Sequence, residues 1–426
     1  MHKYGFYPDF LQDTTESNFA GSRERMKKLM ILGGSRYALP VIKAAHNLGC
    51  YVITCDYLPN NFAHKFSDEY CNVSIVDKKA VLDAARQLKI NGIMSFGCDP
   101  GVVTAAYTAE KMGLFSVGSY EAVSILQNKG KFRKFLTDHG FNAPTAKSYR
   151  SIEQAIDEIS LFRWPVIVKP TDSAGSKGVT RVDSPESLRE SIETALSFSR
   201  SKEFIIEDFL QQKGFSSDSD SFSLNGEFSF ISFNSQRFDL KAENQYTPAA
   251  YSWPASISDT NQTELSNELQ RLISLLELKT SLYNIEVREC TDGKPYIMEC
   301  SPRGGGNRLS EMVRYVNGID MITNAVKAAL GEECANFETK PDVGAWAIII
   351  LHSNKPGIFE ELWISDEIRA FIIERDLWIK PGAMIGAFSA ANQTIGTIIL
   401  RTDTQEKLEE IMSNQEQYIQ VKVKND

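Results

Sequence analysis

Hydrophobic positions in the first third of the chain switch regularly between the two-residue period of strands and the 3.6-residue period of helices. The pattern predicts strands at residues 28–32, 51–56, 71–75 and 92–96, and helices at 38–48, 79–88 and 102–112. Strands that alternate with helices of this length form parallel sheets covered on both faces. Residues 28–118 are therefore predicted to form one doubly wound α/β domain.

Three features of this domain lie where open α/β sheets place ligands. The first strand leads into Gly33-Gly34-Ser35, but the GxGxxG fingerprint is missing, so a tight turn before a packed helix is as reasonable as a nucleotide contact. Asp56, at the end of the second strand, is correspondingly a weak signal for a ribose contact. Asp99 is most simply a helix N-cap or turn residue, and a substrate contact is the alternative.

The rest of the chain mixes helices with hairpins, which is typical of α+β domains. Asn225-Gly226 predicts a type I′ turn inside a hairpin at residues 214–230, and Asp292-Gly293 predicts the turn of a second hairpin at 283–300. Further helices are expected at 119–126, 131–139, 185–200, 264–276, 308–316, 321–330 and 405–412, and further strands at 164–170, 179–182, 203–210, 344–351, 383–388 and 394–401.

The second hairpin contains the clearest candidate for a functional site. Alternation along antiparallel strands allows Glu286 and Glu299 to point to one face. Arg303 and the glycines 304–306 follow at once. Two carboxylates, a cation and a loop with exposed backbone suit a divalent metal that holds phosphates beside an anionic substrate. A surface hairpin with solvated acids is the alternative interpretation.

Two segments could contact a nucleotide. Residues 171–179 form a small, polar, glycine-containing loop whose N–H groups could cover phosphates, although GxxxxGK[ST] is missing and a plain hairpin loop is possible. Residues 203–210 form an apolar strand that ends in Glu207 and Asp208, followed by Phe209 and Leu210. Such an edge could offer backbone groups to an adenine while the two apolar side chains enclose the ring.

Asp218 and Asp220, on the first hairpin, either line the site or face water.

Composition narrows the class of protein. The chain has 426 residues, 42% hydrophobic and 24% charged, which is typical of a globular protein of two or three domains. The net charge of −9 and the lack of a basic run argue against a nucleic-acid partner, and no apolar run is long enough to suggest a membrane partner. Seven scattered cysteines without a CxxC pair indicate free thiols, and we expect a cytoplasmic protein.

The order of these elements resembles the ATP-grasp superfamily over about residues 28–400. The matching sequence segments are VIVKPTDSAGSKGV, IIEDFL and IEVR…YIMECSPRGGG. The resemblance is greatest to carboxylate–amine ligases of the L-amino-acid-ligase and carbamoyl-phosphate-synthetase-like type. It implies a pre-ATP-grasp domain at 28–118, an ATP-grasp domain at 119–330 with a lid subdomain at about 145–210, and a C-terminal α+β cap at 331–426. Residues 1–27 are expected to be an extension that packs on the body or carries a short helix.

The resemblance also implies roles for individual residues. ATP and Mg²⁺ (or Mn²⁺) are the implied cofactors, with Glu286, Glu299 and Ser301 at the metal. The implied catalytic residues are Arg303, Lys169 and Lys177, and the implied substrate-binding residues are Arg303, Gly304, Gly305, Gly306 and Arg308. The implied nucleotide contacts are Lys129, Ile167, Lys169, Ser173, Gly175, Ser176, Gly178, Glu207, Asp208, Phe209, Leu210 and Met298.

One position departs from the family pattern, which usually has Asn where this chain has Ser301. Serine is a shorter and poorer metal ligand, so either water completes the site or one metal position is weaker.

The function implied by the resemblance is ADP-forming ligation of a carboxylate to an amine through an acyl-phosphate. The alternatives are a carbamoyl-phosphate-synthetase-like or purine-pathway-like ligase and an ATP-binding module without catalysis. The sequence does not identify either substrate, and it leaves a homodimer possible.

Overall fold

The computed structural model describes residues 26–335, 337–340 and 344–424. The extension expected at residues 1–27 falls almost wholly outside these ranges. Across the part of the chain that is described, no helix has both the length and the apolar character needed to cross a membrane.

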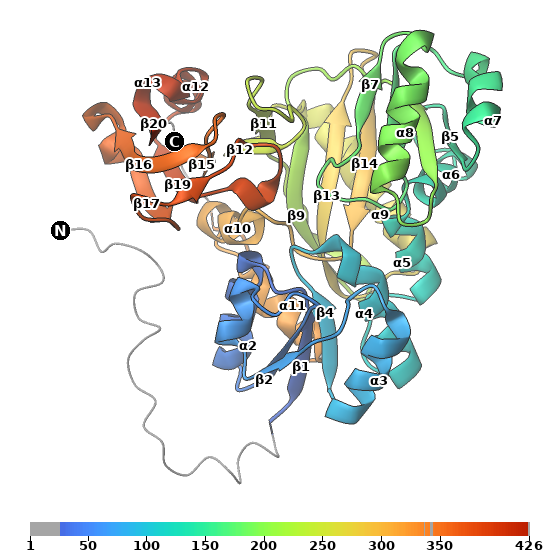
Figure 1. Ribbon diagram of the computed structural model, residues 1–426. Coiled ribbons are helices and arrows are strands. Elements are labelled where there is room, and N and C mark those ends of the chain that lie inside the picture. The colour runs from blue at the N-terminus through green and yellow to red at the C-terminus, as the bar shows by residue number, and fades with distance from the viewer. Residues whose placement is uncertain (1–25, 336, 341–343, 425–426) are drawn as a thin grey trace.

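The N-terminal domain is the predicted parallel sheet with helices on both faces (Figure 1). Its strand order is β3-β2-β1-β4, and all three pairings are parallel. The strands are β1 (Lys28–Leu32), β2 (Tyr51–Cys55), β3 (Glu69–Cys71) and β4 (Gly92–Ser95). The helices are α2 (Leu39–Asn47), α3 (Lys78–Leu88) and α4 (Asp99–Met112). Successive residues of β1 serve opposite faces: Leu29 packs with α2, and Met30 packs with α3 and α4.

The third strand was misplaced by the sequence prediction, which set it at 71–75. The strand ends at Cys71, opposite Cys55, the last residue of β2. Beyond that point β2 offers no backbone partner, so the apolar residues that follow cannot extend the ladder.

A helix from late in the chain completes this domain. α10 (Leu309–Asn317) leads to α11 (Met321–Ala329), which packs beside α2 against the N-terminal sheet. The same core contains Phe222 and Leu282 from the central sheet described below. The N-terminal domain is therefore joined to the rest of the molecule by a continuous apolar core.

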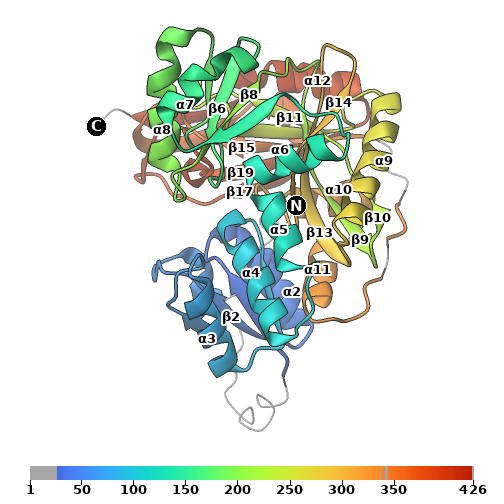
Figure 2. The ribbon, with the colours of Figure 1, turned by 90° about the vertical axis from the view of Figure 1, so that its right-hand side faces the viewer.

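A four-stranded antiparallel sheet forms the region predicted as the lid subdomain. Its order is β5-β8-β6-β7. The strands are β5 (Ala146–Tyr149), β6 (Val166–Pro170), β7 (Thr180–Val182) and β8 (Phe204–Asp208). α7 (Ile152–Asp157) and α8 (Leu188–Phe198) pack against the sheet. α5 (Tyr120–Gln127) and α6 (Lys129–Asp138) connect it to the N-terminal domain (Figure 2).

The two predicted hairpins pair side by side in the central sheet, in the order β10-β9-β13-β14. The strands are β9 (Ser217–Leu224), β10 (Glu227–Phe230), β13 (Ser281–Glu289) and β14 (Pro295–Ser301), and α9 (Asp259–Leu275) packs against the sheet. Asn225 and Gly226 have φ of 51° and 89°, which confirms the predicted type I′ turn. Glu286 lies directly opposite Glu299, so the predicted facing of the two carboxylates is confirmed.

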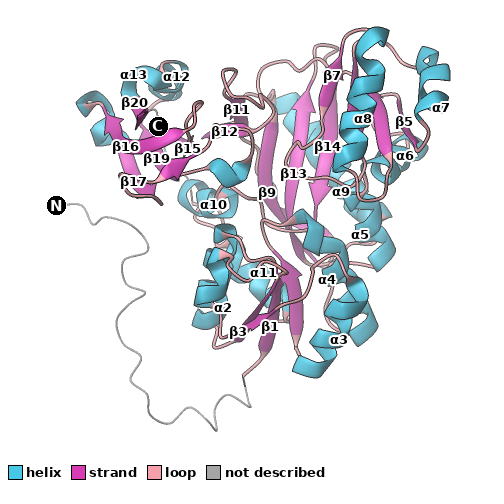
Figure 3. Cartoon of the chain, in the orientation of Figure 1, coloured by secondary structure: helices cyan, strands magenta, loops and turns pink. Residues whose placement is uncertain are grey.

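The C-terminal region is richer in strands than predicted (Figure 3). A five-stranded sheet has the order β11-β12-β15-β19-β17, and a smaller sheet has the order β18-β16-β20. These strands are β11 (Ser235–Phe238), β12 (Pro248–Trp253), β15 (Ala345–Leu351), β16 (Gly357–Ile364), β17 (Ile372–Leu377), β18 (Met384–Ile385), β19 (Gly396–Thr402) and β20 (Ile419–Lys424). The helices are α12 (Gln405–Ser413) and α13 (Gln415–Tyr418).

Sequence analysis missed β16, β17 and β20 because their apolar residues are interrupted by charged ones, as in FEELW and IIERDL. The strand expected at 383–388 is limited to two residues. Because β12 pairs with β15, this sheet includes strands from both sides of the boundary expected between residues 330 and 331.

The shared core predicts a contrast between two leucines. Leu282 is 3% exposed and Leu240 is 75% exposed. Leu282→Ala should lower the free energy of unfolding by about 2–5 kcal/mol, because it leaves a cavity where the two regions meet. Leu240→Ala should change it by about 0.5 kcal/mol or less. Chemical denaturation of both variants checks this, and equal effects would contradict the shared core.

Candidate functional site

A cavity of about 320 Å³ lies where the lid sheet, α6, the central sheet and the N-terminal domain meet. Most of the predicted site residues line it: Lys129, Ile167, Lys169, Ser173, Gly175, Ser176, Lys177, Glu207, Asp208, Phe209, Leu210, Glu286, Met298, Glu299, Ser301, Arg303 and Gly306. Residues from five separate stretches of sequence are thus brought together in one place.

Two lysines line this cavity, and each forms an ion pair with a carboxylate. Lys129 is the first residue of α6, and its Nζ lies 2.9 Å from Glu299 Oε1 and donates to the carbonyl of Ser173 at 3.0 Å. Lys169 Nζ lies 2.8 Å from Glu207 Oε2. Burial lowers the pKa of Lys169, whereas Glu299 outweighs burial at Lys129 and raises its pKa.

Arg133 completes a buried ion cluster that the sequence analysis missed. Its Nε donates to Glu207 Oε1 at 2.9 Å, and Nη1 donates to the carbonyl of Met298 at 2.9 Å. Burial alone would raise the pKa of Glu207, but Arg133 and Lys169 outweigh it and lower the pKa. A signal was available, because Arg133 lies four residues after Lys129 and so on the same helix face.

The paired glutamates have the donor chemistry of a divalent-cation site. Burial and the neighbouring Glu299 raise the pKa of Glu286. Burial also disfavours the charged form of Glu299, but Lys129 and Lys169 outweigh it and lower its pKa to about 2. A divalent cation would relieve the repulsion between the two carboxylates, and carboxylate oxygens are the ligands that Mg²⁺ prefers.

The central sheet carries two parallel rows of polar residues across β9, β13 and β14. Asp218 lies opposite Glu286, which lies opposite Glu299. In the next row Asp220 lies opposite Asn284, which lies opposite Ser301. Burial and Glu286 raise the pKa of Asp218 to about 7, and burial raises that of Asp220 to about 6. Sequence analysis left these two aspartates undecided and missed Asn284, although Asn284, Glu286 and Arg288 alternate along one strand.

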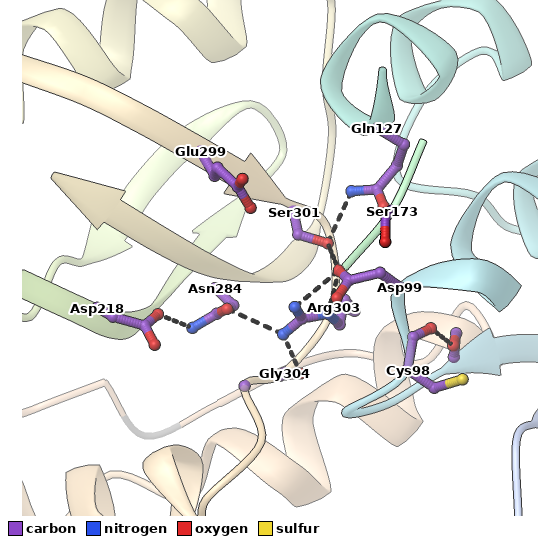
Figure 4. A network of polar contacts seen from close by, with 12 residues as sticks. Cys98, Asp99, Gln127, Ser173, Asp218, Asn284, Glu299, Ser301, Arg303 and Gly304 are labelled. Atoms are coloured by element: carbon purple, nitrogen blue, oxygen red, sulfur yellow. Dashed lines mark hydrogen bonds and ion pairs between the residues drawn. The ribbon is translucent and has the colours of Figure 1, made fainter. Parts of the chain in front are cut away.

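Arg303 is held from two sides (Figure 4). Its Nε and Nη2 each lie 2.7 Å from Asp99 Oδ1, and Nη1 donates to Asn284 Oδ1 at 2.9 Å. Ser301 Oγ donates to the same Asp99 oxygen at 3.0 Å and accepts from Gln127 Nε2 at 2.8 Å. The N-cap of α4 is Cys98, so interpreting Asp99 as the N-cap was wrong. Asp99 instead links the N-terminal domain to the guanidinium.

The glycines after Arg303 allow a close approach between segments. A Cβ on Gly304 would lie 2.3 Å from the Phe96 ring, and the Gly304 carbonyl accepts from Gly97 N at 3.0 Å. Gly305 N donates to both carboxylate oxygens of Asp220, at 2.9 and 3.1 Å. Only Gly306 among the three lines the cavity. The N–H of Gly305 is therefore occupied by Asp220.

Arg308 and Gly178 lie outside the cavity lining. The Arg308 guanidinium donates to Glu311, to Glu374 at 2.7 Å and to Thr397, and so fastens α10 to the C-terminal sheet. Gly178 has φ of 72° and lies against Phe198. These two residues are not brought together with the other predicted site residues.

The loop between β6 and β7 lies over the cavity. Ser176 Oγ donates to the carbonyl of Tyr246 at 3.1 Å, and Gly175, Ser176 and Gly178 all have positive φ. The apolar part of the cavity lining includes Ile167, Phe209, Leu210 and Met298. The Asp208 carboxylate accepts from Arg163 N at 2.8 Å and Nε at 3.1 Å and is therefore committed to that residue.

Comparisons with known proteins agree with this architecture. Residues 162–311 match the family model of the ATP-grasp domain. The chain is 30% identical over 187 residues to the formate-dependent phosphoribosylglycinamide formyltransferase of Synechococcus sp. strain WH7803, covering 43% of this chain and 48% of that protein. It is 26% identical over 253 residues to the carbamoyl phosphate synthase large chain of Thermotoga neapolitana, covering 59% of this chain and 22% of the relative. The matches thus span about half or less of these relatives.

A solved structure resembles the whole described fold. The L-amino acid ligase of Bacillus licheniformis superposes with a TM-score of 0.77 at 20% identity, over 94% of this chain and 99% of that one. Residues 162–311 are therefore an ATP-grasp domain. The described chain as a whole shares the multidomain α/β fold of this ligase.

The buried ion cluster predicts a strong stability effect at Arg133. Its side chain is 3% exposed, whereas that of Arg163, which also pairs with a buried carboxylate, is 88% exposed. Arg133→Met should cost about 3–5 kcal/mol of unfolding free energy, because it removes one of the two cations that compensate Glu207. Arg163→Met should cost about 1 kcal/mol or less. Urea titrations of both variants would refute this reasoning if the two losses were similar.

The raised pKa of Asp218 predicts a pH-dependent effect in buffer without divalent cations. A carboxyl group whose folded pKa lies above its unfolded value stabilises the protein at low pH and loses that contribution as pH rises through the folded pKa, here about 7. Asp218→Asn should therefore gain stability relative to wild type as pH rises from about 5 to about 8. Thermal unfolding across this range checks it, and a pH-independent difference would contradict it.

Proposed function

We propose that this protein is an ADP-forming ligase that uses ATP to activate a carboxylate as an acyl-phosphate and then joins it to an amine. The observation that carries the proposal is the meeting, in one cavity, of two carboxylate-held lysines, the Glu286–Glu299 pair and the Arg303 guanidinium. A module that only binds ATP would not need an arginine, such as Arg303, held beside the two glutamates that suit a metal ion.

The chemistry needs charge neutralisation and positioning more than a nucleophilic side chain. A carboxylate oxygen takes the γ-phosphoryl group and ADP departs. The amine nitrogen then bonds to the carbonyl carbon as the carbon–oxygen bond to phosphate breaks, and the amine releases its proton to solvent. Mg²⁺ bound by Glu286 and Glu299 would neutralise charge on the transferred phosphoryl group.

The chain's own residues have distinct tasks in this proposal. Lys129 and Lys169 hold the phosphates, and the 173–178 loop with Lys177 covers them and excludes water. Ile167, Phe209, Leu210 and Met298 enclose the adenine. The N–H groups of Asp208 and Phe209 already donate to the carbonyls of Thr145 and Pro165, so the expected offer of these groups to the nucleotide is not met.

Arg303 stabilises the negative charge that develops during transfer and on the tetrahedral intermediate. Asp99 and Asn284 hold its guanidinium in place, so the N-terminal domain shapes the site as well as covering it. Ser301 is committed to Asp99 and Gln127, which supports water as the ligand that completes the metal site. Gly306, unlike Gly305, is free to approach the carboxylate substrate.

The decisive measurement is release of ADP and phosphate from Mg²⁺-ATP with a panel of carboxylates and amines. The panel includes amino acids and dipeptides, together with formate and bicarbonate, since formate appears in the name of one relative. We expect substrate-dependent release that falls by at least about 100-fold in Glu299→Gln, because even outer-shell partners of a metal site cost about 10- to 100-fold.

Glu121→Gln is the matched control, since this glutamate is 65% exposed on α5. It should retain full activity. Release of AMP and pyrophosphate would overturn the acyl-phosphate mechanism, and formate or bicarbonate as the best carboxylate would place the protein with the purine-pathway-like or carbamoyl-phosphate-synthetase-like ligases.

A further inference from the structure

Asp218 extends the row of carboxylates one strand beyond the proposed metal pair. Glu299 on β14 pairs with Lys129, Glu286 on β13 lies next to it, and Asp218 on β9 lies at the end of the row away from Lys129. If the lysines mark the phosphates, Asp218 lies on the opposite side of the transferred group, where the acceptor substrates must enter.

The neighbours of Asp218 hold its carboxylate without neutralising it. Asn284 Nδ2 donates to Oδ1 at 2.7 Å, and Oδ2 accepts from the Tyr251 hydroxyl at 3.1 Å and from Gln236 Nε2 at 3.4 Å. All three donors are uncharged. Asp218, Gln236 and Tyr251 also line the cavity.

Asp220, two residues along the same strand, is a useful contrast. It is fully buried, accepts from Gly305 N and from the Ser310 hydroxyl, and does not line the cavity. Asp220 therefore holds the backbone of the glycine loop, whereas Asp218 presents a carboxylate to the cavity. The two acids, although adjacent on one face, have different tasks.

We propose that Asp218, Gln236 and Tyr251 form the subsite for the amine substrate, with the Asp218 carboxylate binding a primary ammonium group. Before attack, this ammonium gives one proton to Asp218 or to solvent, and the resulting free amine is the nucleophile. This inference rests on the proposed ligase function and specifies its second substrate. Phe238 and Tyr246 also line the cavity and suit the hydrocarbon part of an amine substrate. An amine that enters as a cation would offset the negative charge of the neighbouring carboxylates Asp218 and Glu286.

The test separates amine binding from carboxylate activation. Hydroxylamine, which is uncharged at neutral pH, traps an acyl-phosphate as a hydroxamate and needs no ammonium subsite. Wild type, Asp218→Asn and the exposed-residue control Asp83→Asn are assayed with hydroxylamine and, separately, with each of the twenty standard amino acids as the amine. Thermal unfolding verifies that each variant is folded.

In Asp218→Asn we expect the KM for the amino acid to rise about 10- to 100-fold, since a charge-assisted hydrogen bond is lost. Hydroxamate formation and the KM for ATP should stay within about twofold of wild type. Asp83→Asn should match wild type in both assays.

Two results would overturn the inference. An equal loss with both nucleophiles would place Asp218 in activation, and an altered Mg²⁺ requirement at unchanged amine KM would make it a metal ligand. If wild type itself forms no hydroxamate with any carboxylate in the panel, the proposed ligase function fails, and the inference fails with it.

Discussion

The antiparallel register of β13 with its two neighbours is the constraint on which the site depends. It aligns Asp218, Glu286 and Glu299 in one row and Asp220, Asn284 and Ser301 in the next. A shift of one residue would turn each set to the opposite face, against the core under α9. Burial of Tyr283, Ile285 and Val287 on that face therefore fixes where the polar side chains point.

Charge compensation then determines which of these groups stay ionised. Glu207 is deeply buried but has two cations, Arg133 and Lys169, and its pKa is lowered. Asp218 has only neutral hydrogen-bond donors, and its pKa is raised. The carboxylates toward the lid sheet are thus compensated by cations, whereas Asp218 toward β9 is not paired with one among the described residues. A cationic substrate at that end would favour the ionised form of Asp218.

Much of the local architecture could be predicted from sequence because it depends on short-range patterns. Alternation, with the Asn225-Gly226 turn in one and the Asp292-Gly293 turn in the other, identified both hairpins, and the strand–helix period identified the N-terminal domain. Prediction was poorer for strands whose limits or existence depend on the neighbouring strand. β3 ends where its partner β2 ends, and β16 and β17 become strands only because neighbouring strands pair with their charged, irregular sequences.

The sequence by itself determined the order of strands and helices in the N-terminal domain, the two hairpins of the central sheet and the facing of Glu286 and Glu299, because residue periodicity alone dictates which side chains share a face. Only the tertiary structure decided which other groups meet them. Asp99 reaches Arg303 across more than 200 residues of chain, Arg133 reaches Glu207, and Arg308 is drawn to Glu374 and away from the cavity. Such long-range ion pairs leave no local pattern, since they depend on how separate sheets pack against one another.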